Sequence, residues 1–359
     1  MNNEHIFPCD QCGAKLTFSV EEGELQCPYC AHINLIQRHY TQVVEKDYEQ
    51  AIEKLHDLAQ KDDGMHDVKC PNCAATFEQD NKVYASQCSF CGTAVVNEVA
   101  LYRPITPQAL LPFSVTQNEV KEIFKTWLKN HWFAPSKLKH HSAQESKIKG
   151  IFIPHWTYDT NTYSQYEGKR GDVYYENERY TTRVNGQIKI RTRSVEKTSW
   201  TRVSGDLNKS FDDVLVMASN SISYTLSHWD LSNLVDYDKS YLSGFESEVY
   251  SIELDDGLEL AKQQMLLAIK QDIKRKIGGD KQQITSLSSD YFDITFKHVL
   301  LPVYSSSYIF EDKEYNFVVN ARSGEIKGER PYSKVKIVFA VLLAALAVGA
   351  VYYLGWFEN

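Results

Sequence analysis

The sequence predicts an α+β fold in three parts: two small N-terminal metal-binding units, a larger mixed α+β domain with antiparallel strands, and one C-terminal transmembrane helix. Three observations lead to this prediction. All eight cysteines lie in evenly spaced pairs between Cys9 and Cys91. Residues 105–330 combine amphipathic helical patterns with alternating, aromatic-rich strand patterns. Residues 337–356 contain no charged side chain.

The cysteines form four Cys-x-x-Cys pairs, and fourteen residues separate the two pairs of each half. Each cysteine of the first half recurs 61 positions later, which indicates an internal duplication. Two pairs at this distance can meet through a short hairpin and hold one tetrahedral four-sulfur site, as structural zinc prefers. The sequence therefore predicts zinc ribbons at residues 5–36 and 68–97 and two structural zinc ions. Their expected ligands are Cys9, Cys12, Cys27, Cys30, Cys70, Cys73, Cys88 and Cys91.

Small residues follow the second cysteine of every pair and leave room for backbone N–H groups to approach the thiolates: Gly13, Ala31, Ala74 and Gly92. Disulfides are less favoured than zinc because the chain is long enough to form an ordinary core. The sequence from Cys27 to Cys30 is similar to a glutaredoxin active-site motif. A redox pair, however, works alone at the start of a helix, whereas here a second pair lies at ligand spacing. Iron stays open, because four thiolates suit both ions.

Between the ribbons, residues 37–67 are expected to form a helical connector, with an amphipathic helix over residues 40–60. The proline-containing stretch 103–107 leads into the α+β domain, residues 105–330. The first helix of that domain is indicated by a capping box of Thr116 and Glu119.

The remaining pattern of the domain favours strands around two further helices. Strand signals begin at residues 151–154, and alternation over 172–203 is typical of long hairpins. We expect a short helix at 211–220 and a long one at 258–277, which ends at Gly278 as its C-cap. Three strands are expected after it, at residues 296–304, 307–310 and 315–320.

A faint internal repeat is visible in this domain. Residues 149–156 read Lys-x-Ile-Phe-Ile-Pro-x-Trp, and residues 297–304 read Lys-x-Val-Leu-Leu-Pro-x-Tyr, each after a predicted helix. The pattern suggests two copies of a helix-plus-strands unit. The alternative is coincidence between two apolar strands that end in proline.

The net charge of −8 is unevenly distributed. Residues 1–100 hold 16 acidic and 7 basic residues, whereas residues 101–330 hold 30 of each. A ribbon that grips nucleic acid through phosphates is expected to be basic, so the acidic ribbons disfavour that use. One predicted strand face carries Lys189, Arg191 and Arg193 opposite two isoleucines, and it is a possible anion-binding site. A solvated basic face is the simpler interpretation.

The charge-free stretch 337–356 predicts a single-pass transmembrane helix. At about 1.5 Å per residue it spans about 30 Å, the thickness of the hydrocarbon layer. Aromatic residues lie near its far end, and Arg330, Lys334 and Lys336 precede it. Because basic residues stay cytoplasmic, the N-terminal bulk is expected in the cytoplasm. A buried core helix is the alternative.

No catalytic motif stands out from the sequence. There is no phosphate loop, no nucleophile elbow and no His-Glu-x-x-His motif. The histidines are scattered, and His155 and His298 lie beside strand signals, where a packing role is expected. The sequence therefore favours a protein that is not an enzyme.

The cysteine pairs, together with the stretches 319–325 and 328–333 before the apolar run, resemble bacterial membrane proteins with TFIIB-type zinc ribbons. The resemblance covers most of the chain and implies a location in the bacterial inner membrane. Such proteins are sometimes described as relatives of the primosomal replication-restart helicase. Because the chain has no phosphate loop, the resemblance does not bring helicase activity with it.

These observations favour a membrane-anchored cytoplasmic zinc-ribbon protein that acts as a non-enzymatic binding or scaffold module for a protein partner. The alternative is a nucleic-acid-binding protein held at the membrane. An enzyme with a site formed by scattered residues of the middle domain stays open.

Overall fold

The computed structural model describes residues 7–37, 44–58, 65–70, 76–80, 83–87, 93–96, 105–135, 138, 148–184, 187–221, 224–311 and 313–357. Three predicted ligands, Cys73, Cys88 and Cys91, lie outside the described residues, as does the start of the predicted helix over 40–60.

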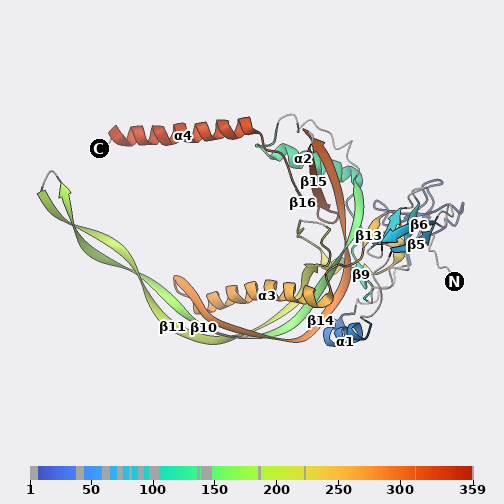
Figure 1. Cartoon of the computed structure of the whole chain (residues 1–359), viewed down its shortest axis with the longest axis horizontal. Coiled ribbons are helices and arrows are strands. Elements are labelled where there is room, and N and C mark those ends of the chain that lie inside the picture. Colours follow the sequence, from blue (N-terminus) through green and yellow to red (C-terminus); the bar gives the residue numbers. More distant parts are fainter. Residues whose placement is uncertain are drawn as a thin grey trace.

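A long, strongly curved antiparallel sheet forms the body of the protein (Figure 1). Its central strand β10 (Lys149–Val184) pairs along one edge with β11 (Gln187–Met217) and along the other with β14 (Lys281–Phe310). The smaller strands β15 (Lys313–Asn320) and β16 (Ile326–Gly328) extend the sheet beyond β14. The three long strands confirm the predicted antiparallel class and are far longer than the predicted segments.

Helix α3 (Leu254–Ile277) covers the concave side of the three long strands (Figure 1). Ile269, Ile273 and Ile277 pack against Tyr166 on β10 and against partly buried residues of β11 and β14. The helix ends as predicted, because Gly278 has φ of 65° and donates its N–H to the carbonyl of Lys274.

Helix α2 (Gln117–Asn130) covers the opposite end of the sheet and has the predicted capping box. The Glu119 N–H donates to the Thr116 hydroxyl, and the Thr116 N–H donates to the Glu119 carboxylate at 2.7 Å. Val120, Phe124 and Leu128 are buried in the main core, which also contains Phe317.

The predicted short helix at 211–220 is wrong, because β11 continues to Met217. Phe211 pairs with Thr160, and Val214 pairs with Tyr158, so the register shifts across Asp212 and Asp213. The shift is a β-bulge, and Asp213 adopts a positive φ of 51° there. The bulge interrupts the strand alternation and leaves apolar residues three positions apart, which imitates helical spacing.

The sheet core contains two units with the same order of elements. The first unit is β9 (Ala109–Leu110), α2, β10 and β11, and the second is β13 (Glu246–Glu248), α3, β14 and β15. Strand β9 pairs in parallel with β14, and β13 pairs in parallel with β10. The first strand of each unit therefore pairs with the long strand of the other unit. In both units a short segment separates the first strand from the helix, residues 111–116 in the first unit and 249–253 in the second.

Equivalent hydrogen bonds recur in the two units. The N–H groups of Ser114 and Val115 both donate to the carbonyl of Ala321. In the other unit, the N–H groups of Ser251 and Ile252 both donate to the carbonyl of Ala218. The aromatic residue two positions after each strand proline also has the same role: Trp156 Nε1 donates to Ile252, and the Tyr304 hydroxyl donates to Val115. The two units are therefore related by an approximate two-fold arrangement around the paired strands β10 and β14.

The N-terminal segments pack on the outside of this body. Strands β1 (Thr17–Ser19), β2 (Glu24–Gln26) and β3 (Ile33–Asn34) form a separate small sheet. Strands β5 (Met65–Lys69) and β6 (Thr76–Asp80) pair with each other, and β7 (Val83–Gln87) and β8 (Ala94–Val96) join the large sheet through β13.

The connector helix α1 (Tyr48–Leu58) begins eight residues later than predicted. Strand β4 (Lys46–Asp47) precedes it and pairs with β14, and the Asp47 carboxylate accepts the N–H of Gln50 at the helix start. The fold is completed by β12 (Val235–Asp236) beside β9 and by two short 3-10 helices, η3 (Leu231–Asn233) and η4 (Lys239–Leu242).

Helix α4 (Lys334–Phe357) projects from the body (Figure 1). Within the described part of the chain it is the one helix long and apolar enough to cross a membrane, with a mean hydropathy of 2.2 over Lys334–Val351 and no part of that window buried. Twenty-four residues of α-helix span about 36 Å, enough for a bilayer.

Candidate metal centre

The first two cysteine pairs lie on matching turns. The Gly13 N–H donates to the carbonyl of Cys9, and the Ala31 N–H donates to the carbonyl of Cys27. Both turns require a positive φ, 72° at Gly13 and 58° at Ala31. Glycine has no Cβ and adopts this conformation freely, which suits Gly13, whereas Ala31 adopts it as a non-glycine residue.

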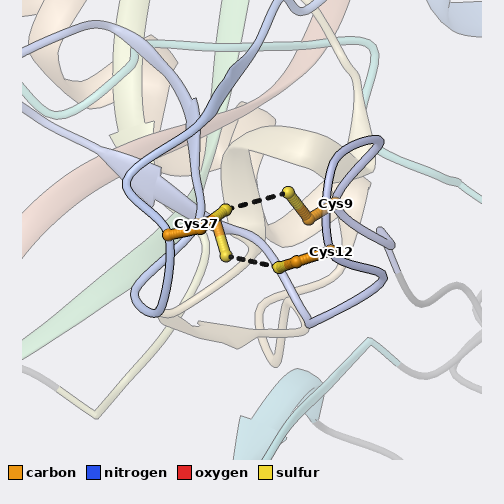
Figure 2. A group of neighbouring side chains, drawn as sticks. Cys9, Cys12 and Cys27 are labelled. Carbon is orange, nitrogen blue, oxygen red and sulfur yellow. Dashed lines mark hydrogen bonds between the residues drawn. The ribbon is translucent and has the colours of Figure 1, made fainter.

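The two turns bring four sulfur atoms together (Figure 2). Cys9 Sγ lies 3.6 Å from Cys30 Sγ, and Cys12 Sγ lies 3.5 Å from Cys27 Sγ. All four sulfurs lie within 4.8 Å of one another. A tetrahedral zinc site with bonds of about 2.3 Å has sulfurs about 3.8 Å apart, whereas a disulfide joins sulfurs at about 2.05 Å. The spacing therefore fits four ligands around one metal ion and excludes a disulfide at either close pair.

The surroundings of the sulfurs shift the pKa values of the thiols in opposite directions. Backbone N–H groups of Cys30 and Tyr29 point at the Cys27 sulfur and lower the pKa of that thiol to about 7. At Cys30 the N–H of His32 favours the thiolate, but desolvation and the neighbouring sulfurs outweigh it and raise the pKa to about 12. Four thiolates this close repel one another, so a bound cation is the physical means of keeping them all ionised.

One cysteine of each pair faces the body of the protein. Cys9 and Cys27 are buried, whereas Cys12 and Cys30 are exposed. The same side of the ribbon carries Leu16 and Phe18, which belong to the main core of the α+β domain. A site with four sulfurs and no open position suits a structural ion, because a catalytic zinc keeps one position for water or substrate.

The ribbon is attached to the body through η4 and the turn after it. The Phe18 N–H donates to the carbonyl of Ser243 at 2.9 Å, and the Ser243 hydroxyl donates to the carbonyl of Leu16 at 2.8 Å. The Phe18 ring lies 5.3 Å from the ring of Tyr241 and 6.3 Å from that of Phe245. Strand β1, which lies between the two cysteine pairs in the sequence, thus contacts the body directly.

For the second four-cysteine set, the structure describes Cys70, which is buried. The strands around it form the hairpins β5–β6 and β7–β8, as a ribbon requires. The second metal ion stays a prediction.

The basic strand residues lie on one face near the end of the β10–β11 hairpin. Lys189, Arg191 and Arg193 pair across the strands with Thr182, Tyr180 and Glu178. Arg193 forms an ion pair of 3.3 Å with Glu178 and lies over the Tyr180 ring. All three cations are exposed, and Arg193 is the one engaged by the ion pair with Glu178.

The two histidines beside strand signals are buried, as expected for packing residues. His155 Nδ1 lies 3.0 Å from the carbonyl of Ile153, and His298 Nδ1 lies 3.0 Å from that of Ile105. Burial lowers the pKa of His155 to about 4 and that of His298 to about 3, so both are neutral at physiological pH.

Sequence reasoning missed a charge cluster around the buried Lys297 at the bulge. Lys297 Nζ lies 2.7 Å from Asp213, 3.1 Å from Glu45 and 3.9 Å from Asp159. Burial and the neighbouring Glu45 raise the pKa of Asp159 to about 7, whereas a hydrogen bond from Asp159 lowers the pKa of Glu45 to about 2. The two carboxyl groups therefore share a proton, and the cluster attaches the segment before α1 to the sheet. No sequence signal links residues so far apart.

Comparison with known proteins adds one relative. The chain is 25% identical over 341 residues to "Uncharacterized protein YdjG" of Bacillus subtilis (strain 168), and the match covers 92% of this chain and 91% of that protein. No protein-family model matches the chain. No solved structure matches it.

Proposed function

We propose that this protein is a membrane-anchored, non-enzymatic zinc protein that binds a protein partner through the far end of its β10–β11 hairpin. The observation that carries the proposal is the exposure of this hairpin end, residues 172–200, which we call the arm. Helix α4 provides the anchor, and the metal centre has a structural role.

The arm extends beyond the part of the sheet that is covered. The last pair between β10 and β14 is Gly171 with Lys281, so past this point β10 and β11 pair only with each other among the described residues. An isolated two-stranded hairpin is marginally stable in water. A hairpin that projects this far (Figure 1) is best explained by a partner that covers it.

The arm carries the side chains that protein interfaces favour. Ile188 and Ile190 are each 72% exposed, and exposed aromatic residues lie nearer its base: Tyr174, Tyr175, Tyr180 and Trp200. Aromatic residues with arginine are enriched in interface hot spots.

The charges of the arm indicate an acidic partner surface. Glu176 and Glu178 near its middle are paired with Lys197 and Arg193. Residues 179–193 hold five basic residues and no acidic one. A partner with an acidic patch around an apolar contact would complement this surface and associate faster at low ionic strength.

Zinc in the ribbons supports this function indirectly. The first ribbon packs into the core of the body, so an ion bound there stabilises the scaffold that carries the arm. Metal analysis of the full chain tests this point, with two equivalents of zinc per chain as the expected result. One equivalent or none would contradict the assignment of two ions. Finding iron in the metal analysis would show that the sites hold iron and not zinc.

Site-specific photo-crosslinking in cells tests the partner. A photoreactive residue at Ile188 or Ile190 is expected to give a discrete protein adduct, whereas the same residue at Leu267, which is exposed on α3, is expected to give none. The proposal fails if the arm positions give no protein adduct, or give the same adducts as Leu267.

Nucleic acid is the second candidate ligand, and the exposed cations Lys189 and Arg191 favour it. A fluorescence titration of the full chain with labelled RNA and DNA at low salt decides the matter, because phosphate contacts are strongest there. Binding that weakens steeply with salt, and that is lost on replacing both cations with glutamine, would favour this candidate over a protein partner.

A further inference from the structure

The turn after α2 exposes two large aromatic side chains. Trp132 is 53% exposed and Phe133 is 39% exposed, and their ring centroids lie 5.1 Å apart at an interplanar angle of 69°. Apolar rings on a protein surface are costly in water unless something covers them. These rings belong to the turn formed by residues 131–134.

Those surroundings are the first turn of α4. The Ser333 N–H donates to the carbonyl of Phe133 at 2.8 Å. Lys336 Nζ donates to the carbonyls of Trp132 at 3.0 Å and Ala134 at 2.8 Å. Lys336 is also the last charged residue before the charge-free run of α4. The aromatic turn thus lies at the boundary where α4 changes from polar to apolar.

The segment that leads into α4 adds the same kind of side chain. Tyr332 is 59% exposed, and the Arg330 guanidinium lies 5.5 Å from its ring centroid and 5.9 Å from that of Trp127. Lys334 and Lys336 follow directly. Tryptophan and tyrosine together with basic residues are the composition of a membrane–water interface on the cytoplasmic side.

We propose that the turn 131–134 and Tyr332 form a second membrane contact, which lies in the headgroup region of the bilayer around the start of α4. The inference rests on the proposed membrane anchor. Its occupant is lipid because the turn is held at the polar end of the membrane-length helix, where a bilayer interface meets it without any further partner. The contact would fix the height of the body above the membrane.

The arrangement sets one geometric condition. Figure 1 shows the arm and α4 projecting to the same side of the body. A hairpin with charged side chains on both faces is not stable in hydrocarbon. When α4 spans a bilayer, the arm must therefore lie outside the hydrocarbon layer. The bonds of Ser333 and Lys336 keep the aromatic turn at the polar end of α4.

Tryptophan quenching by spin-labelled lipids tests the proposal on the full chain in vesicles of zwitterionic and anionic phospholipid. The label sits either near the headgroup or near the end of the acyl chain. Trp132→Phe is compared with Trp200→Phe, an exposed tryptophan on the arm, and with Trp356→Phe on α4. Trp132→Phe is expected to remove a fluorescence component that the headgroup label quenches more than the chain-end label does. Trp200→Phe is expected to remove a fluorescence component that neither label quenches.

The outcomes separate this inference from the membrane anchor itself. If the Trp356 component is not quenched by either label, α4 is not in the bilayer and the anchor fails. If Trp356 is quenched but the Trp132 component is as unquenched as that of Trp200, the anchor stands and the second contact is overturned. Protection of Trp132 from both lipid labels and aqueous iodide would show a protein covering the turn, and would overturn it too.

Discussion

The first ribbon is expected to unfold together with the body, because its apolar side belongs to the main core. Phe18→Ala tests this coupling. The Phe18 side chain is buried, and its removal takes away two ring contacts and leaves a cavity between the ribbon and the segment that follows η4. Phenylalanine-to-alanine changes in cores cost about 3–5 kcal/mol. At the lower end of this range, about 3 kcal/mol, the change favours the undocked ribbon roughly 150-fold.

Hydrogen exchange on the full chain in detergent measures the effect. Amides of residues 243–248, which follow η4 and include β13, are expected to lose protection by about the same factor, whereas those at the centre of β14 change little. Tyr29→Ala is the matched control, since Tyr29 lies on the same ribbon and is 82% exposed. Exposed positions usually change stability by less than about 0.5 kcal/mol.

Unchanged protection at residues 243–248 in Phe18→Ala, with the variant still folded, would refute the coupling. The ribbon would then be an independent unit whose contacts with η4 contribute nothing. A metal-free preparation gives the same test without a substitution, because removal of the ion is expected to release the same amides.

Three further predictions concern other parts of the molecule. Cys27→Ser is expected to lower the bound metal by one equivalent per chain in elemental analysis, and an unchanged metal content would place the ion elsewhere. Asp159 has a folded pKa of about 7, above its ordinary value of 3.8, so its contribution to stability is full at acidic pH and is lost as pH rises towards 7 and beyond. Asp159→Asn should therefore flatten the fall in thermal stability between about pH 4 and pH 7, and a variant with the same slope as the wild type contradicts the shared proton with Glu45. Gly257→Ala should destabilise the protein by about 1–3 kcal/mol in urea unfolding although alanine favours helices, because a Cβ there would lie 2.5 Å from the Tyr158 hydroxyl; a gain in stability would show that the helix moves freely.

Local signals predicted one end of each body helix, whereas α3 begins at Leu254, before the predicted start at residue 258. Thr116 and Glu119 cap α2, and Gly278 ends α3, because capping depends on residues within one turn of the helix end. The two matching cysteine turns were predictable for the same reason, since two residues between ligands determine the turn. Such features need no knowledge of the rest of the chain.

Features that depend on distant residues were not predictable. The bulge at Asp213 turned a strand into an apparent helix, because its physical cause is the pairing with β10. Lys297 meets Glu45 across about 250 positions of sequence, and nothing near either residue indicates the other. Phe18 lies far from Tyr241 and Phe245 in the sequence, and only the fold shows that these two rings complete its surroundings.

The two-unit arrangement of the body offers an argument about function. The units share the order of their elements and the hydrogen bonds that join them, so this shared part accounts for stability. They differ in their hairpins: β10 and β11 have 36 and 31 residues, whereas β14 and β15 have 30 and 8. Helix α3 has 24 residues and α2 has 14, and the longer helix lies along the extended hairpin. A fold that needed only two packed units would require neither the extra strand length nor the longer helix. The arm is thus the part of the body that stability does not explain, and it is where a binding function should be sought first.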